Sequence, residues 1–131
     1  MGGKIGHLPL RGAMEKPEID FRPEPAPVEL EIRDLIVGDG PEATAGAHVT
    51  VHYVGVDYET GEQFDASWDR GQSIEFPLNG LIQAWQVGIP GMKVGGRREL
   101  VCPPKTAYGE SGGHRLAGRT LVFVIDLLQV R

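Results

Sequence analysis

Cysteine, long apolar runs and an excess of basic charge are all scarce in this sequence. Cys102 is its only cysteine, so the chain forms no intramolecular disulfide and no cysteine-based zinc site. No apolar run approaches the ~20 residues that a membrane-spanning helix needs, and the N-terminus lacks the apolar core of a secretory signal. The net charge is −5, with acidic and basic residues interleaved, which argues against a nucleic-acid partner. We therefore expect a cytoplasmic protein that contacts neither membrane nor nucleic acid.

Glycine and proline are abundant, with 19 and 10 residues, and they separate short apolar segments. This spacing is typical of many short strands joined by tight turns. Residues 1–27 carry no apolar periodicity and end in alternating prolines, which favour extended, unpaired backbone. We expect residues 1–27 to be a flexible N-terminal tail, part of it a tag or linker, and residues 28–131 to fold as one domain.

Strict alternation of apolar and polar side chains predicts the strands. The alternating segments are residues 28–33, 48–53, 74–78, 97–102 and 121–127. In each of them the apolar side chains are expected to face the core. In the first segment this rule places Val28, Leu30 and Ile32 on one face of the strand and the charged residues between them on the other.

One segment departs from the strand pattern. Residues 81–87 place Leu81 and Trp85 at helical spacing between flanking glycines, which predicts a helix of about two turns. Thr60-Gly61 lies between two apolar runs and predicts a hairpin turn. Five or six antiparallel strands and one short helix indicate an α+β fold, in which a sheet wraps over the helix.

The common catalytic motifs do not fit their surroundings. Gly109-Glu-Ser-Gly-Gly113 has the spacing of a serine hydrolase elbow, but that elbow needs a strand before it and a helix after it. Here prolines precede the motif and a glycine-rich loop follows, so Ser111 is not expected to be a nucleophile. His48 and His52 share a strand face, but no carboxylate or cysteine is spaced to complete a metal site. Glycine-rich phosphate-binding motifs are absent, so we expect neither a metal nor a nucleotide cofactor.

A set of aromatic side chains remains, drawn from six different segments. Each is inward by its periodicity or stands next to a turn: Tyr53, Phe64, Phe76, Trp85, Tyr108 and Phe123. Periodicity alone is compatible with a plain core and with a binding site. Both interpretations therefore stay open at this point.

The local contexts of these residues distinguish the two interpretations. In order along residues 28–131 stand Val51-His-Tyr-Val-Gly55, Phe64-Asp-Ala-Ser67, Gly80-Leu-Ile-Gln-Ala-Trp85, Gly91-Met-Lys-Val-Gly95, Ala107-Tyr-Gly109 and Thr120-Leu-Val-Phe123. Together these blocks closely resemble the single-domain FKBP-type peptidyl-prolyl cis-trans isomerases, the immunophilins that bind tacrolimus and rapamycin. The style of the chain looks bacterial.

This resemblance implies a strongly twisted half-barrel sheet over one short helix, with a hydrophobic cavity between them. It assigns catalysis to Asp65, Tyr108, Phe64 and Trp85, with the indole as the cavity floor. The substrate- or inhibitor-binding set that it implies is Tyr53, Phe64, Asp65, Arg70, Ile74, Phe76, Leu81, Ile82, Trp85, Tyr108, His114, Leu116 and Phe123. His114 and Leu116 are placed by loop position only, because the loop after Tyr108 lacks the paired prolines usual in the family. Ile74 stands where an aromatic residue is common.

The implied function is isomerisation of the peptide bond before proline in peptides and unfolded proteins, which assists their folding. Macrolides of the tacrolimus and rapamycin type would bind in the same pocket. We expect a monomer without cofactor. The alternative is a binding module that holds a proline-containing partner or a macrolide without turning it over.

Overall fold

The computed structural model describes residues 15–20, 22 and 24–131 of the chain. Its elements, in chain order, are β1 (Glu31–Ile36), β2 (His48–Asp57), β3 (Gln63–Ala66), η3 (Ser67–Arg70), β4 (Ile74–Pro77), η4 (Leu78–Gly80), α1 (Gln83–Gly88), β5 (Arg97–Cys102), η5 (Pro104–Thr106) and β6 (Leu121–Val130). The three η elements are short 3₁₀ turns. Within these residues no helix has the length and apolar character to cross a bilayer.

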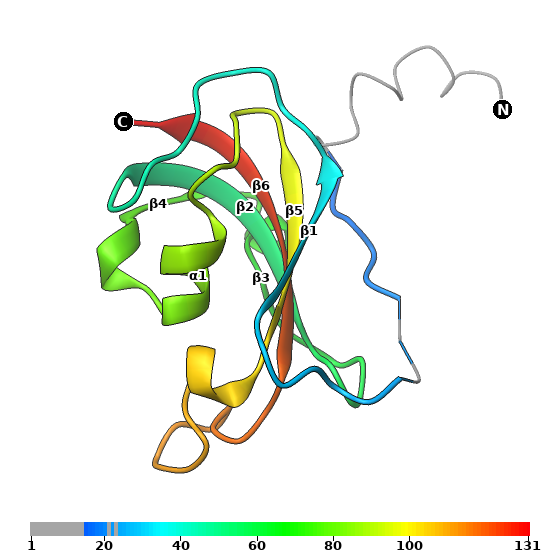
Figure 1. Cartoon of the computed structure of the whole chain (residues 1–131). Helices are drawn as coiled ribbons and strands as arrows, with labels where there is room; N and C mark the ends of the chain where they lie inside the picture. Colours follow the sequence, from blue (N-terminus) through cyan, green and yellow to red (C-terminus); the bar gives the residue numbers. More distant parts are fainter. Residues whose placement is uncertain (1–14, 21, 23) are drawn as a thin grey trace, which may run out of the picture.

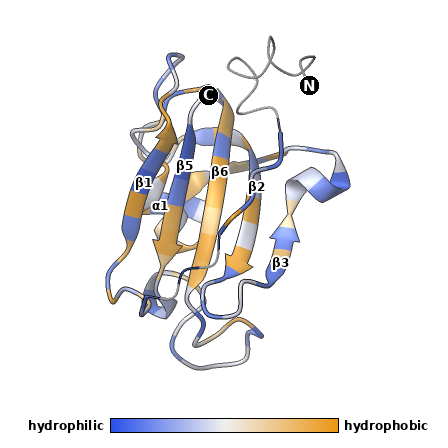
Figure 2. Cartoon of the chain, turned by 90° about the vertical axis from the view of Figure 1, so that its right-hand side faces the viewer, coloured by the Kyte–Doolittle hydropathy of each residue, from blue (hydrophilic) through white to orange (hydrophobic). Residues whose placement is uncertain are grey.

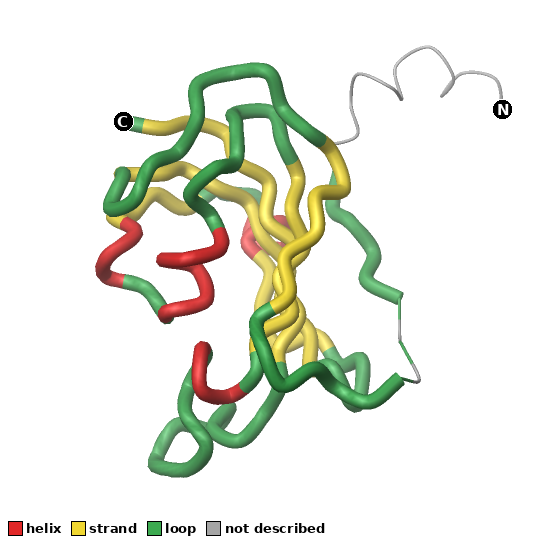
Figure 3. The backbone as a smooth tube through the Cα atoms, in the orientation of Figure 1, coloured by secondary structure: helices red, strands yellow, loops and turns green. Residues whose placement is uncertain are grey.

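The described strands form one antiparallel sheet in the order β1-β5-β6-β2-β3, and β4 pairs with β2 beyond the end of β3. The sheet twists strongly, and α1 lies against one of its faces (Figure 1). The helical turns η4, α1 and η5 gather on that same side (Figure 3). This architecture confirms the predicted α+β fold, with a six-stranded antiparallel sheet over a single short α-helix.

The main core lies between the sheet and α1. The alternating residues of β2 and β6 supply it as predicted, with Val49, Val51, Ile125 and Leu127 almost fully buried. Leu100 and Cys102 of β5 join the same cluster, which confirms their predicted inward orientation. These strands could be predicted from the sequence because their inner faces are buried in the core. Each inward position must then be apolar, which produces the alternation.

The N-terminal end of the sheet differs from the prediction. β1 begins at Glu31, after Val28, whose side chain is 77% exposed. Ile32 is 45% exposed, although it pairs with Leu100 and therefore shares the face of that main-core residue. The predicted start of the strand at Val28 is therefore wrong, whereas Ile32 keeps its predicted place in the alternation. Ile32 stays partly exposed because β1 lies at the edge of the described sheet, where it pairs only with β5.

A second apolar cluster covers the opposite, outer face of the sheet. Its buried members are Val54, Val56, Tyr58, Ala66, Val101 and Val122. Figure 2 looks onto this face and shows hydrophobic residues along β6 and β2. Ile19 and Ala26 pack against the cluster from the segment that precedes β1.

We call residues 15–27, as far as the structure describes them, the N-terminal strap. The sequence predicts a flexible tail up to residue 27, whereas the strap runs along the outer face of the sheet, opposite α1 (Figure 1). Arg97 donates to the carbonyl of Glu15 at 2.6 Å, and the Tyr58 hydroxyl donates to the carbonyl of Glu24 at 3.0 Å. The predicted tail residues 1–14 lie outside the described part of the chain.

Candidate active site

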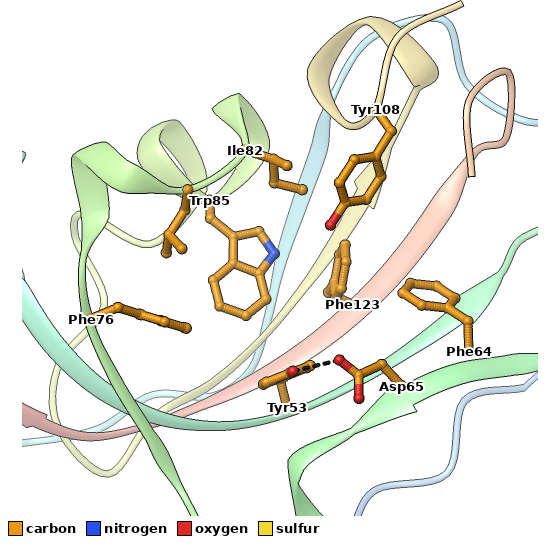
Figure 4. A pocket seen from close by; sticks show the side chains of 9 residues that line it. Tyr53, Phe64, Asp65, Phe76, Ile82, Trp85, Tyr108 and Phe123 are labelled. Carbon is orange, nitrogen blue, oxygen red and sulfur yellow. Dashed lines mark hydrogen bonds between the residues drawn. The ribbon is translucent and has the colours of Figure 1, made fainter. Parts of the chain in front are cut away.

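A cavity of about 140 Å³ lies between α1 and the inner face of the sheet. Aromatic and aliphatic side chains make most of its wall, and the Asp65 carboxylate and the hydroxyls of Tyr53 and Tyr108 are its polar side-chain groups. The nine lining residues are Tyr53, Phe64, Asp65, Phe76, Leu81, Ile82, Trp85, Tyr108 and Phe123. They come from β2, β3, β4, β6, α1 and the turns beside them, and they surround one hollow (Figure 4). Only the fold brings these segments together.

Trp85 closes the cavity from the side of α1. Its side chain is 5% exposed and meets three rings edge-on: Tyr53 at 5.3 Å, Phe123 at 5.2 Å and Phe76 at 5.7 Å between centroids. Edge-to-face pairs place the positive rim of one ring against the negative face of another. The three contacts hold the indole in one orientation, so the bottom of the cavity has a defined shape.

A hydrogen-bonded group of Tyr53, Asp65 and Arg70 forms the polar edge of the cavity. The Tyr53 hydroxyl donates to Asp65 Oδ2 at 2.5 Å, and Arg70 Nη1 donates to Asp65 Oδ1 at 2.7 Å. Arg70 Nη2 also donates to the Tyr53 hydroxyl oxygen at 3.1 Å. One carboxylate is thus held by two donors from two different elements.

These contacts determine the charge of the group. Burial would raise the pKa of Asp65, but the hydrogen bonds from Tyr53 and Arg70 outweigh it and hold that pKa below its usual range. Burial, together with the Asp65 hydrogen bond, raises the pKa of Tyr53. At neutral pH the edge therefore carries a carboxylate, a neutral phenol and a guanidinium.

The turn η3 brings Arg70 to this position. Ser67 Oγ accepts a hydrogen bond from the backbone N–H of Tyr53 at 2.7 Å, which fixes the start of the turn on β2. Gly71 ends the turn with φ of +67°, a conformation that glycine adopts without strain. Arg70, which the family resemblance places in the binding set, thereby contacts both Asp65 and Tyr53 through its guanidinium.

Tyr108 stands at the opposite edge and points its hydroxyl into the cavity (Figure 4). Its ring stacks on the imidazole of His114, with centroids 3.9 Å apart and planes inclined by 9°. His114 Nδ1 accepts a hydrogen bond from the backbone N–H of Leu116 at 3.0 Å, so the loop holds the imidazole in place. Burial, with the nearby charge of Asp65, raises the pKa of Tyr108 and keeps its hydroxyl a donor.

Nine of the thirteen predicted binding residues line the cavity, and four do not. Arg70 acts on the lining through Asp65 and Tyr53, and His114 supports Tyr108 from outside. Leu116 is buried in the main core, and Ile74 pairs with Val51 at the margin of the sheet.

Gly55 is a site residue that the sequence prediction does not assign. A Cβ at this position would lie 2.6 Å from Phe64 Cζ and 2.9 Å from Phe123 Cε1. Both rings therefore rest against bare backbone of β2. A glycine inside the apolar run between the predicted strand 48–53 and the Thr60-Gly61 turn is the signal that could have found it, because glycines within strands mark close approaches.

The alternative sites that the sequence raised are placed elsewhere. Ser111 is exposed in the loop that follows Tyr108. His52 stacks on Trp68 at 4.1 Å, and its Nδ1 lies 2.8 Å from Ser67 Oγ. In the part of the chain that the structure describes, no cluster of three His, Cys, Asp or Glu side chains could hold a metal ion.

Comparison with known proteins gives matches over most of the chain. Residues 40–128 match the family model of FKBP-type peptidyl-prolyl cis-trans isomerases. The chain is 66% identical over 116 residues to the "Probable FK506-binding protein" of Corynebacterium glutamicum, covering 88% of this chain and 98% of that protein. It is 52% identical over 123 residues to the "FK506-binding protein" of Streptomyces anulatus, covering 90% and 99% respectively.

Solved structures give the same result. The crystal structure of AtFKBP13 matches with a TM-score of 0.69 and 34% identity, over 81% of this chain and 96% of that chain. The crystal structure of FkpA from Escherichia coli matches with a TM-score of 0.73 and 29% identity; this chain is covered to 98% and spans 59% of that protein. The matched segment contains the whole aromatic wall of the cavity, and the chain belongs to the FKBP-type peptidyl-prolyl cis-trans isomerase family.

Proposed function

We propose that the aromatic cavity is the site at which this isomerase rotates X-Pro bonds of unfolded and partly folded proteins, and so assists their folding. The size and lining of the hollow carry the proposal. An apolar cavity of about 150 Å³ accepts a benzene ring, and this one measures about 140 Å³. A proline ring is smaller than benzene and fits the same space, with Trp85 beneath it.

Rotation about a peptide bond breaks no σ bond but costs about 18–20 kcal/mol, because the twisted amide loses its resonance. The planar amide is the more dipolar form. Water stabilises that form, and an aromatic pocket without water favours the twisted form instead. The pocket therefore binds the transition state more tightly than the ground state, which lowers the barrier.

Two donors at the cavity are available to hold the substrate carbonyls. Among the described residues, neither the Tyr108 hydroxyl nor the backbone N–H of Ile82 has a hydrogen-bond partner. Both residues line the cavity (Figure 4). Asp65 is occupied by Tyr53 and Arg70 and is ionised, so its part is to set the local field and not to carry a proton.

A protease-coupled assay on an X-Pro tetrapeptide tests this assignment. Tyr108→Phe removes one hydrogen bond to the substrate, and about 1.4 kcal/mol of lost stabilisation corresponds to a tenfold fall in kcat/KM. Ser111→Ala changes an exposed loop residue and keeps the wild-type rate. Equal rates for the wild type and Tyr108→Phe would refute the assignment of Tyr108. A pure binding module would show no catalysed rate at all.

We also propose that macrolides of the tacrolimus and rapamycin type bind in this cavity. The names of the two bacterial relatives support the proposal, and so does the ring-lined wall. Binding would cover Trp85 and quench its fluorescence, while Trp68, stacked on His52 outside the cavity, supplies a constant background. Quenching should parallel inhibition of the isomerase rate. Inhibition without any change in Trp85 emission would place the macrolide elsewhere.

A further inference from the structure

The N-terminal strap is the largest described feature outside the residues that match the family model, which begin at residue 40. It makes specific contacts along its length. Pro17 is buried, and Ile19 is half-buried on the outer apolar cluster. Arg97 holds the carbonyl of Glu15 and also pairs with the buried Asp126 at 2.7 Å. The outer face of the sheet is therefore covered by a segment with defined anchors.

The strap also contacts the turn η3. Lys16 Nζ lies 2.7 Å from Asp69 Oδ1, and Gln63 donates to the other oxygen of Asp69 at 2.7 Å. Trp68 packs on the same outer cluster as Ile19. The strap thus contacts η3 directly at Asp69, and its Ile19 shares the outer cluster with the preceding residue, Trp68.

The next residue of the turn faces the other way. Arg70 follows Asp69 directly, and its guanidinium reaches Asp65 and Tyr53 at the polar edge of the cavity. The same four-residue turn therefore meets the strap on one side and the site on the other. A 3₁₀ turn of this length has little internal stability, so its external contacts determine where Arg70 points.

We propose that the strap is a positioning element of the isomerase site: by holding Trp68 and Asp69, it keeps Arg70 on Asp65 and Tyr53. This inference rests on the proposed function of the cavity. Lys16 and Ile19 act through Arg70 and touch no substrate. The strap lies outside the residues that match the family model, and it would help to order the polar edge of the cavity.

A double-mutant cycle in the full chain tests the proposal. The strap variant is Lys16→Ala/Ile19→Ala, and Arg70→Met removes the group through which the strap acts. We expect kcat/KM to fall about threefold in the strap variant and about tenfold in Arg70→Met. The combined variant should stay at about tenfold, because two changes in one pathway do not multiply; independent effects would give about thirtyfold. Val28→Ala, which changes a 77% exposed side chain, is the matched control and keeps the wild-type rate.

A second readout separates positioning from plain stabilisation. If the strap holds Arg70 in place, the carboxyl carbon of Asp65 should titrate at a higher pH in the strap variant, as it does in Arg70→Met. Urea unfolding confirms that each variant is folded under assay conditions. If the strap variant Lys16→Ala/Ile19→Ala is unfolded, Lys16→Ala alone is used. The carboxyl carbon of Asp65 should again titrate at a higher pH than in the wild type.

Three results have distinct meanings. Multiplicative rate losses, or an unchanged Asp65 titration in a folded strap variant, would overturn the positioning role. A wild-type chain without isomerase activity would instead count against the proposed function of the cavity. The combination of a coupled rate loss and a raised Asp65 titration supports the strap as a positioning element.

Discussion

Replacing Gly55 by alanine would press on two rings of the cavity wall from behind. The added Cβ would lie 2.6 Å from Phe64 Cζ and 2.9 Å from Phe123 Cε1. Ordinary contact begins at 3.4 Å, so the nearer ring atom has to move by 3.4 minus 2.6, or about 0.8 Å. Gly55 has no positive φ, and alanine is therefore acceptable to the backbone itself. The substitution therefore acts through its contacts with the rings of Phe64 and Phe123, and not through backbone strain.

The added Cβ would push both rings away from β2. The backbone of β2 stands behind them, and the cavity of about 140 Å³ lies in front. Overpacking of this kind costs about 1–3 kcal/mol of the free energy of unfolding. Displacement of a site by about 1 Å can lower a rate by up to ~100-fold. We therefore expect kcat/KM to fall by about ten- to a hundredfold, which corresponds to about 1.4–2.7 kcal/mol.

The protease-coupled X-Pro assay measures the rate, and urea unfolding measures the stability of the same preparation. Gly113→Ala is the control, because a Cβ there meets no atom within 4 Å and the residue has no positive φ. It should keep both rate and stability. A Gly55→Ala protein that is folded and has the wild-type kcat/KM would show that the rings yield without narrowing the site, and the reasoning would fail.

Three other predictions concern ionisable groups. In Tyr53→Phe, Asp65 loses one of the two side-chain hydrogen bonds that lower its pKa, so its carboxyl should titrate at a higher pH in carbon-detected NMR; an unchanged titration would contradict the geometry. Burial raises the pKa of Asp126 to about 6 although Arg97 donates to it, so the folded state binds this proton more tightly than the unfolded chain. The free energy of unfolding should therefore fall as the pH rises from about 4 to about 6, and urea titrations should find that slope reduced in Asp126→Asn. Burial also raises the pKa of Cys102 to about 12, so a thiol reagent should label it only after unfolding, and rapid labelling of the native protein would disprove its burial.

The strands of the inner face could be predicted because one physical requirement determines them. In β2 and β6 every second residue is buried against α1, and the alternation follows directly. The short helix was identifiable from the change of period around Trp85. The predicted start of β1 lies three residues before the observed one. An edge strand pairs with a neighbour on one side only and is less buried, so its alternation marks its ends less clearly.

Contacts of the outer face could not be read from the pattern of residues 15–27. The strap is an extended, proline-containing segment, and its burial depends on a surface made by four other strands. A partial signal was present in β6, where Val122 and Val124 stand between the inward residues and make the run almost continuously apolar. Such runs indicate a strand that is covered on both faces.

The amino-acid sequence by itself determined the antiparallel alternation, the short helix and the ordered set of aromatic and polar residues typical of the family. Each of these features depends on the residues within a segment or on the order of the segments, and both can be seen in the sequence. Only the tertiary structure decided that nine side chains leave a hollow between them, that Arg70 meets Asp65 and Tyr53, and that Gly55 sets the position of two rings. Each of these depends on the closing of the sheet over α1, because a cavity is the space that residues from distant segments fail to fill.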